Sequence, residues 1–432
     1  MDERGGEMLL QFNFGNFRSF KDDTTLDLTA AKISEYSNHI TTIGNEKVLP
    51  VAAIFGANAS GKTNVLEAFR YMTEYVIDSF AYGGAEKHKK DEFAAMKPTP
   101  FLFDSNSSSG TSSFEVFFAS KKSARTVFYN YGFTVDRHGV SEEWLNYKAK
   151  SSRGDYKRVI YRNKSKLELV GIAPKSRENI EIALEKEVLV VSLGAKLKIE
   201  KLSLVRDWFL KNEFADFGHP LENLMLSRQL PDEFPNSKAV QQEVVKFINQ
   251  FDTSIIGFDI EALEQDSDEK TRRFRIGAIH KMTGSDHTTT IPLRLESAGT
   301  LKMFALYPLL KNTLDRGGIL FIDELNANLH PLLARLLIIT FLNLEINNRQ
   351  AQLIFTTHDS WHLNSNLLRR DEIWFTEKDS DGVSSLFSLV DFVDVDGNKI
   401  RKDEDYVKNY LLGKYGAIPT LKYYDMLRER YA

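Results

Sequence analysis

The residues from Gly56 to Thr63 combine glycines, a lysine and a hydroxyl group at a spacing that suits phosphate binding; in order they are Gly56, Ala57, Asn58, Ala59, Ser60, Gly61, Lys62 and Thr63. They match the pattern G-x-x-x-x-G-K-[ST] at every position, and we include the following Asn64 in the same site. The glycines let backbone N–H groups turn inward around phosphate oxygens. Lys62 would reach the β- and γ-phosphates, and the Thr63 hydroxyl would bind Mg²⁺.

The flanks of this motif support a nucleotide site. The apolar run 51–55 before it predicts a buried strand, and residues 64–69 after it predict the first turns of a helix. The alternative is a glycine-rich strand-to-helix turn that matches by chance, and the correct flanks on both sides make it the poorer interpretation.

Two adjacent carboxylates, Asp323 and Glu324, follow the apolar run 319–322. At the end of a buried strand, Asp323 would hold Mg²⁺ through its shell and Glu324 would polarise an attacking water. An acidic pair at a strand end could instead cap a helix in solvent. The phosphate-binding motif earlier in the chain favours the catalytic interpretation.

His358 ends another apolar run, 353–357, that predicts a strand. A histidine at this place could touch the γ-phosphate or the attacking water. A lone histidine after a strand is more often structural, but its position after the acidic pair favours a functional role.

The segment 295–300 contains the small residues Ser297, Ala298 and Gly299 and precedes a predicted helix. Such a helix start can present backbone N–H groups and the Ser297 hydroxyl to an anion. Taken alone, the segment could be no more than an N-cap and a turn.

The composition is that of an ordinary globular protein, with 432 residues, 42% hydrophobic and 27% charged. A net charge of −4 gives no global basic field for nucleic acid, although a local basic patch remains open. The chain has no cysteine, which excludes disulfides, thiolate metal sites and cysteine nucleophiles. We find no apolar run long enough to span a bilayer and no signal peptide, so we expect a cytoplasmic protein.

The pattern along the chain predicts an α/β protein whose middle is helical. Strands are expected at 9–14, 25–29, 114–118, 127–135, 159–161, 255–260 and 273–279. Helical spacing dominates between them, at 202–209 and 240–248. We therefore expect three parts: residues 1–170 with the phosphate loop and an antiparallel sheet, a compact, mostly helical insertion at 171–252, and residues 253–432 with the acidic pair and His358.

Taken in order, these motifs resemble the ABC-type ATPase heads of the RecF, SMC and OLD group. The resemblance implies a P-loop NTPase fold with ATP and Mg²⁺ as cofactors. The segment 296–300 stands at the place of the family's signature, 325–331 at its D-loop, and Asn16-Phe17-Arg18-Ser19-Phe20 is similar to its N-terminal "NFRSF" strand. By that resemblance Arg18 lies near the nucleotide, and Glu324 and His358 are the catalytic residues.

The resemblance also implies how two copies work together. In ABC-type heads, the signature of each chain caps the nucleotide that the other chain's phosphate loop holds. Ser297, Ala298 and Gly299 would then face Lys62 of the partner, and ATP would close a homodimer or a higher homo-oligomer. Closure would supply a second set of donors to the γ-phosphate.

The stretches 324–331 and 409–419 resemble a narrower group, AAA-type ATPases of the RloA/AbiL kind, which are linked to abortive infection and restriction. This implies a part in bacterial anti-phage defence. The acidic pairs at 379–382 and 394–397 could suggest a nuclease, but each is also an Asp-Gly hairpin turn. We therefore expect any nuclease to be a separate effector protein, with nucleic acid as a possible partner and no membrane contact.

The sequence departs from the family pattern at two places. Ala298 stands where transporter members carry glycine, and no glutamine occurs between Lys62 and Val170 to serve as the Q-loop residue. Two alternatives therefore stay open. One is a RecF-like repair ATPase that binds DNA, and the other is an ATP-gated sensor or scaffold with slow turnover. A membrane transporter cassette is a poorer fit.

Overall fold

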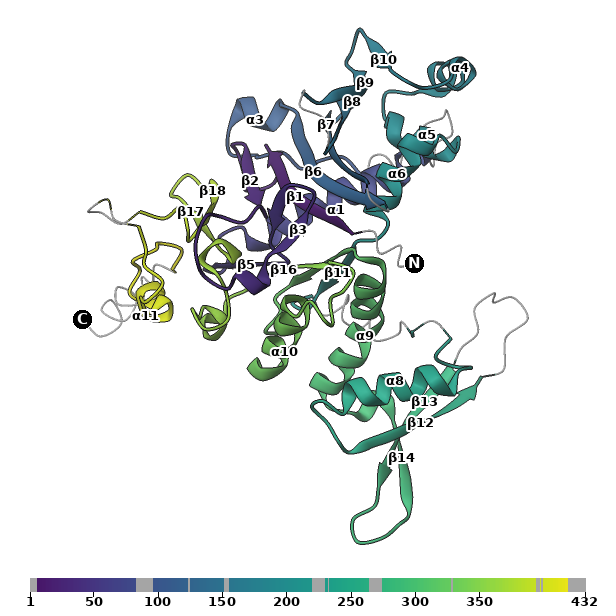
Figure 1. Cartoon of the computed structure of the whole chain (residues 1–432), viewed down its shortest axis with the longest axis vertical. Helices are drawn as coiled ribbons and strands as arrows, with labels where there is room; N and C mark the ends of the chain where they lie inside the picture. The colour runs from purple at the N-terminus through teal and green to yellow at the C-terminus, as the bar shows by residue number, and fades with distance from the viewer. Residues whose placement is uncertain are drawn as a thin grey trace, which may run out of the picture.

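The computed structural model describes residues 6–82, 96–122, 125–150, 155–219, 230–231, 233–263, 274–327, 329–393, 397 and 399–418. Two large sheets stand one above the other in its main body, and a smaller lobe projects from one side (Figure 1). Within the described residues, no helix is long and apolar enough to cross a membrane.

The first large sheet has seven strands in the order β10-β9-β8-β7-β6-β1-β2, and all neighbours are antiparallel. The strands are β1 (Glu7–Gly15), β2 (Thr24–Asp27), β6 (Ser112–Lys122), β7 (Arg125–Asp136), β8 (Gly139–Ala149), β9 (Lys157–Arg162) and β10 (Leu167–Leu169). The first five strands expected from the sequence all lie in this sheet. Strand β8 was not predicted.

The second large sheet has six strands in the order β11-β15-β16-β5-β17-β18, and every neighbouring pair is parallel except β17 and β18. Its strands are β5 (Val51–Gly56), β11 (Glu213–Asp216), β15 (Ile319–Asp323), β16 (Gln352–Thr357), β17 (Ile373–Lys378) and β18 (Ser384–Ser388). The phosphate loop, the acidic pair and His358 follow β5, β15 and β16. They therefore meet at the carboxyl edge of the parallel strands, where α/β folds bind ligands.

Helices cover both faces of the parallel sheet. The helix α1 (Lys62–Asp78) lies between the two sheets, together with α5 (Val190–Lys196) and α6 (Glu200–Phe209), and shares one apolar core with them. On the other face, α9 (Ala298–Arg316), α10 (Pro331–Leu342) and α11 (Tyr406–Leu411) pack in a second core. Alternate residues of β15 enter the two cores, as expected for a strand buried on both faces.

The projecting lobe has a core of its own (Figure 1). It consists of α8 (Lys238–Ile248) and the antiparallel strands β12 (Ile255–Ala262), β13 (Phe274–Lys281) and β14 (Thr288–Pro292). Phe304 and Tyr307 of α9 complete this core. Because α9 also packs on the parallel sheet, it joins the lobe to the nucleotide-binding part of the molecule.

The segment 171–252 differs from the expected compact insertion. Its helices are present, but α4 (Pro174–Ala183), α5 and α6 pack with the antiparallel sheet, β11 joins the parallel sheet, and α8 belongs to the projecting lobe. The reason is that the apolar faces of these helices are covered by different sheets, which the spacing of apolar residues does not reveal.

The remaining elements are short. They are α3 (Ser105–Ser109), the hairpin of β3 (Thr41–Ile43) and β4 (Glu46–Val48), and the 3-10 turns η1 (Ser37–His39), η2 (Ser79–Ala81), η3 (Leu293–Leu295), η4 (Ser360–His362) and η5 (Arg370–Glu372). The predicted Asp-Gly turn at 379–382 connects β17 and β18, while the acidic residues of the second predicted turn, 394–396, lie outside the described residues.

Candidate nucleotide site

The phosphate loop leaves β5 at Gly56 and enters α1 at Lys62, as the motif predicts. Gly56 and Gly61 have φ angles of +156° and +114°. A Cβ on Gly56 would lie 2.6 Å from the carbonyl oxygen of Thr376, and one on Gly61 would lie 2.6 Å from Ser384 Oγ. Both glycines are therefore required because the β17–β18 hairpin packs tightly against the loop.

Hydroxyl groups from that hairpin hold the loop in place. Ser60 Oγ lies 2.6 Å from Thr376 Oγ1. Ser384 Oγ donates to the Ser60 carbonyl oxygen at 2.7 Å and lies 2.8 Å from Ser19 Oγ. Ser60, Thr376 and Ser384 are all buried, so these bonds are shielded from water. Sequence reasoning did not find Thr376 or Ser384, because neither belongs to a motif.

The side chain of Lys62 folds over the loop. Its Nζ donates to the carbonyl oxygens of Gly56 at 2.9 Å and Ala57 at 3.1 Å. Burial lowers the pKa of Lys62, and the nearby Glu324 and Asp323 carboxylates oppose that shift. A phosphate group would replace weak carbonyl partners with a full negative charge, so the environment of Lys62 fits a polyphosphate.

Asp323 and Thr63 stand together as hard oxygen ligands. Thr63 Oγ1 donates to one carboxylate oxygen of Asp323 at 2.8 Å, and Thr356 Oγ1 donates to the other. A hydroxyl and a fixed carboxylate suit Mg²⁺, which takes few protein ligands and completes its shell with phosphate oxygens and water. No cluster of three His, Cys, Asp or Glu that could hold a metal occurs in the described part of the chain.

Glu324 and His358 are in direct contact. His358 Nδ1 lies 2.7 Å from Glu324 Oε2, and His358 Nε2 lies 3.1 Å from Asn326 Nδ2. Thr357 Oγ1 donates to Asn326 Oδ1 at 2.7 Å, which turns the Asn326 amide nitrogen toward the histidine. With the Asn326 amide in this orientation, His358 accepts at Nε2 and donates from Nδ1 to the Glu324 carboxylate.

The backbone at Glu324 adopts the left-handed conformation, with φ of +53°. Its N–H donates to Thr356 Oγ1 at 2.9 Å, so the same hydroxyl fixes both members of the acidic pair. Left-handed backbone is costly for a residue with a Cβ and is found where the surrounding structure requires it.

A cavity of about 640 Å³ opens beside these groups. Its lining combines predicted and unpredicted residues: Asn58, Ala59, Gly61, Lys62, Thr63, Asn64, Gly218, Glu324, Ala327, His358 and Lys378. Of the predicted residues, Gly56, Ala57, Ser60 and Asp323 are not part of this lining. Gly218 and Lys378 were missed because Gly218 follows β11 and Lys378 ends β17, and only the strand order places the carboxyl ends of these strands beside the site.

Arg18 lies next to the site and does not line the cavity. Its guanidinium contacts Asn64 Oδ1 at 3.4 Å and pairs with Glu67 at 3.0 Å, so it sits on the first turns of α1. Asn16 supports this position, because its side chain bonds the carbonyl oxygens of Ser107 and Thr111. The predicted position of Arg18 near the nucleotide remains a prediction.

The signature residues are on the surface, at the start of α9. Ser297 caps this helix by accepting from the Thr300 N–H at 3.1 Å. Ser297 and Ala298 are exposed, Gly299 is half-buried, and none of the three lines the cavity of its own chain. The same chain's phosphate loop therefore does not use them.

No glutamine is among the residues that line the cavity. The strand next to β15 is β11, and it begins only at Glu213 because the antiparallel sheet and three helices precede it. Phe217 and Gly218 follow β11, and Gly218 lines the cavity. The next glutamine, Gln229, lies outside the described residues.

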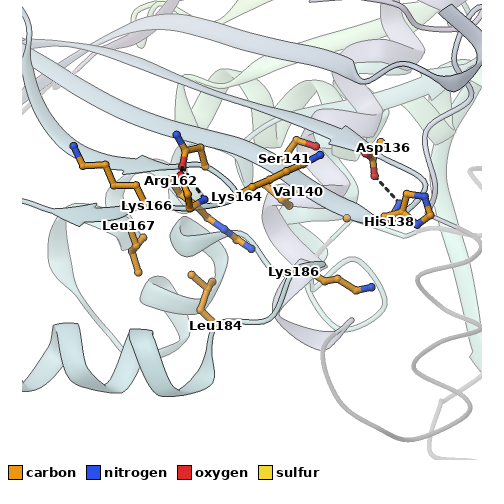
Figure 2. A pocket seen from close by; sticks show the side chains of 13 residues that line it. Asp136, His138, Val140, Ser141, Arg162, Lys164, Lys166, Leu167, Leu184 and Lys186 are labelled. Atoms are coloured by element: carbon orange, nitrogen blue, oxygen red, sulfur yellow. Dashed lines mark hydrogen bonds between the residues drawn. The ribbon is translucent and has the colours of Figure 1, made fainter. Parts of the chain in front are cut away.

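A second cavity, of about 660 Å³, lies at the outer end of the antiparallel sheet (Figure 2). Besides one carboxylate, Asp136, its lining includes the cationic side chains of Arg162, Lys164, Lys166 and Lys186. Arg162 is buried and donates to the carbonyl oxygens of Val188 and Glu185, whereas the lysines are exposed. This is a local basic surface on a chain whose net charge is −4.

The strand order and the site are those of a P-loop NTPase. Residues 51–360 match the model of the family described as "AAA domain, putative AbiEii toxin, Type IV TA system". The match covers more than half of the chain, and the chain belongs to this family of AAA ATPases.

Two solved structures are similar over 88% of this chain. An SMC head bound to the C-winged helix domain of ScpA has 15% identity and a TM-score of 0.38, with 97% of its own chain covered. The recombination mediator RecF with ATP has 14% identity and a TM-score of 0.35, with 98% covered. No curated protein matches the chain. The assignment of the chain to the AAA family rests on the family match, and the P-loop NTPase fold is seen in the strand order.

Proposed function

We propose that this protein binds ATP with Mg²⁺, hydrolyses it, and uses the cycle to open and close a homodimer. The observation that carries this proposal is the Glu324–His358 pair, at 2.7 Å, in one cavity with Lys62 and Thr63, whose hydroxyl donates to Asp323. A phosphate-binding lysine, a pair of metal ligands and an oriented carboxylate are the parts that ATP hydrolysis needs.

Each residue has a distinct part in the proposed reaction. The N–H groups of the phosphate loop and Lys62 bind the β- and γ-phosphates, and Thr63 and Asp323 hold the metal. Mg²⁺ supplies charge neutralisation for the phosphate oxygens when bound. Glu324 orients a water molecule and accepts its proton, while the N–H of His358 fixes the direction of the carboxylate.

We infer that the second half of the site comes from another copy of the chain. Ser297 and Ala298 at the start of α9 are exposed, and neither lines the cavity of its own chain. A second chain could place its Ser297 hydroxyl and the N–H groups at the start of α9 against the γ-phosphate. ATP would then hold two copies together until it is hydrolysed.

At the biological level, we propose that this cycle regulates a separate effector, a nuclease, in bacterial anti-phage defence in the cytoplasm. The description of the family refers to a toxin of a toxin–antitoxin system, which supports a defence role. An ATP-trapped form of the protein would serve as bait, and a co-purifying nuclease whose activity changes with ATP is the expected result. Recovery of no partner from phage-infected cells would contradict this part.

The enzymatic proposal is tested by ATP turnover and sedimentation of the wild type and Glu324→Gln, each with and without Mg-ATP. We expect turnover in the wild type, a loss of about 10²- to 10⁴-fold in the variant, and ATP-dependent dimers that persist in the variant. The matched control is Glu345→Gln, an exposed glutamate at the end of α10, which should behave as the wild type. Nucleotide binding without turnover in the wild type would favour a sensor, and no binding would refute the site.

The basic cavity supports a second candidate function, direct nucleic-acid binding. Lys164 forms no ion pair with any described residue, so its charge is available for a phosphate. Binding of a labelled duplex should weaken steeply as the salt concentration rises. Lys164→Glu should lower the affinity, and it should lower the slope of log affinity against log salt concentration by about one unit. Lys238→Glu, at the start of α8, is the control. Salt-independent or undetectable binding would exclude this function.

A further inference from the structure

Lys302 is a buried lysine that the nucleotide site does not use directly. It lies on α9, little more than one turn after the Ser297 cap, and is 7% exposed. No carboxylate of the described residues lies within ion-pair distance of its ammonium group. A buried ammonium group with no ion pair to a described residue requires an explanation, because desolvation of an ammonium group is costly.

The ammonium group of Lys302 joins two loops that line the nucleotide cavity. Its Nζ donates to the carbonyl oxygen of Ala327 and lies 3.5 Å from that of Phe217. It also lies 4.3 Å from the centre of the Phe217 ring, within the range of a cation–π contact. Ala327 lines the cavity, and Phe217 precedes Gly218, which also lines it.

These two loops are bound to the catalytic residues. The Ala327 N–H donates to the Glu324 carbonyl oxygen at 2.8 Å, and the Phe217 N–H donates to the Asp323 carbonyl oxygen at 3.0 Å. If a bound nucleotide displaces either loop, the carbonyl oxygen of Phe217 or of Ala327 moves, and Lys302 contacts both of these oxygens directly. Because Lys302 is part of α9, the same displacement reaches the helix start that carries Ser297 and Gly299.

Stability does not account for this lysine. Burial lowers the pKa of Lys302 to about 8, and the Asp216 carboxylate at the end of β11 opposes the shift only in part. Since the folded pKa lies below that of an unfolded lysine, the stability linked to this group is complete above the unfolded pKa and is lost as the pH falls through about 8. At pH 7 the charged lysine is therefore a cost to the fold.

We propose that Lys302 is a positioning residue that couples the nucleotide state of a chain to the way the same chain presents its signature to a partner. This inference rests on the proposed function. The ammonium group holds α9 to the two loops, so the start of α9 and the loops that line the cavity move together. Charge matters because one cation must hold two carbonyl oxygens and a ring face at the same time.

The test compares Lys302→Met and Lys302→Arg with Lys311→Met. Lys311 is a matched control because it lies on the same helix, is half-exposed and pairs with Glu243 and Asp315. We expect Lys302→Met to bind Mg-ATP with unchanged affinity and to lose about tenfold in kcat and in ATP-dependent dimer formation measured on the Glu324→Gln background. Lys302→Arg should recover both, and Lys311→Met should resemble the wild type.

The pH profile provides a readout that a residue kept only for packing would not alter. Turnover of the wild type should fall as the pH rises through about 8, where Lys302 loses its proton, whereas turnover of Lys302→Arg should not fall there because arginine stays charged. If Lys302→Met does not fold, this comparison still decides the question.

Two results would overturn the inference in different ways. An active wild type with kcat and dimer formation unchanged in Lys302→Met would refute the role of Lys302 alone. A wild type that neither turns over ATP nor dimerises with it would refute the proposed function, and the inference with it.

Discussion

At the residue scale, Asp323 and Glu324 are neighbours with different surroundings, and this difference separates their roles. Both carboxylate oxygens of Asp323 accept hydroxyl groups, from Thr63 and Thr356, and the residue is buried. Glu324 is turned by its left-handed backbone toward the cavity, where it meets His358. A fixed acceptor suits a metal, and an accessible oriented one suits a water molecule.

The contact between His358 and Glu324 leads to a prediction for turnover. His358→Ala removes the N–H that orients the carboxylate, so we expect kcat to fall about ten- to a hundredfold while ATP affinity changes little. His358→Gln, which keeps a donor, should recover part of the loss. The measurements are steady-state phosphate release and equilibrium nucleotide binding, with the exposed His287→Ala as the control. A kcat in His358→Ala equal to that of the wild type would show that Glu324 needs no such partner.

The sequence was sufficient to predict those site residues whose chemical type and spacing form a short motif. Lys62, Thr63, Asp323 and Glu324 are recognisable because each belongs to a short motif, and the structure brings them together. Thr356, Gly218 and Lys378 are not recognisable, because they are ordinary residue types that come to lie at the site only through the order of the strands. The place of the signature in a partner's site remains a proposal.

At the scale of elements, the β17–β18 hairpin packs against the phosphate loop and holds it by hydrogen bonds. Thr376 contacts Ser60, and Ser384 contacts both Ser60 and Ser19, so the hairpin connects the loop to the N-terminal segment around Arg18. The loop therefore has its shape before a nucleotide binds. Preorganisation of this kind lowers the ordering cost of binding.

This support predicts a binding defect for Thr376→Val. The variant keeps the shape of the side chain and removes the hydroxyl that contacts Ser60 Oγ, a loss of about 1 kcal/mol or about fivefold in ATP affinity. Thr313→Val is the matched control, because Thr313 is equally buried and its hydroxyl bonds only Leu309 of its own helix. Titration calorimetry with both variants would show the effect. Equal affinities would mean that the hairpin does not shape the loop.

Elements that were missed or misassigned have physical causes. Strand β8 carries the buried Glu143, whose carboxylate accepts the N–H groups of Val190 and Val191 at the start of α5. An inward carboxylate breaks the alternation of apolar and polar residues on which strand prediction depends. The predicted helical spacing at 202–209 and 240–248 corresponds to α6 and α8, but which sheet covers each helix depends on long-range packing.

At the scale of the whole molecule, α9 is the element that connects the parts. It starts at the exposed Ser297, packs on the parallel sheet, contributes to the core of the projecting lobe, and holds Lys302 against two cavity loops. The side of the molecule that carries Ser297 and the side that carries Lys62 are thus coupled through one helix. This arrangement favours function in pairs, since each chain has a nucleotide cavity and, separately, a signature surface.

The most direct test of the account is to mix two inactive variants, Lys62→Ala and Ser297→Arg, and to measure ATP turnover. If each active site combines Lys62 of one chain with Ser297 of another, each mixed dimer regains one intact site. At a one-to-one ratio, turnover should rise to about a quarter of the wild-type rate, as expected for random pairing in a symmetric dimer. Each variant alone should remain inactive. A mixture no more active than its two components, with an active wild type, would contradict a site shared between chains.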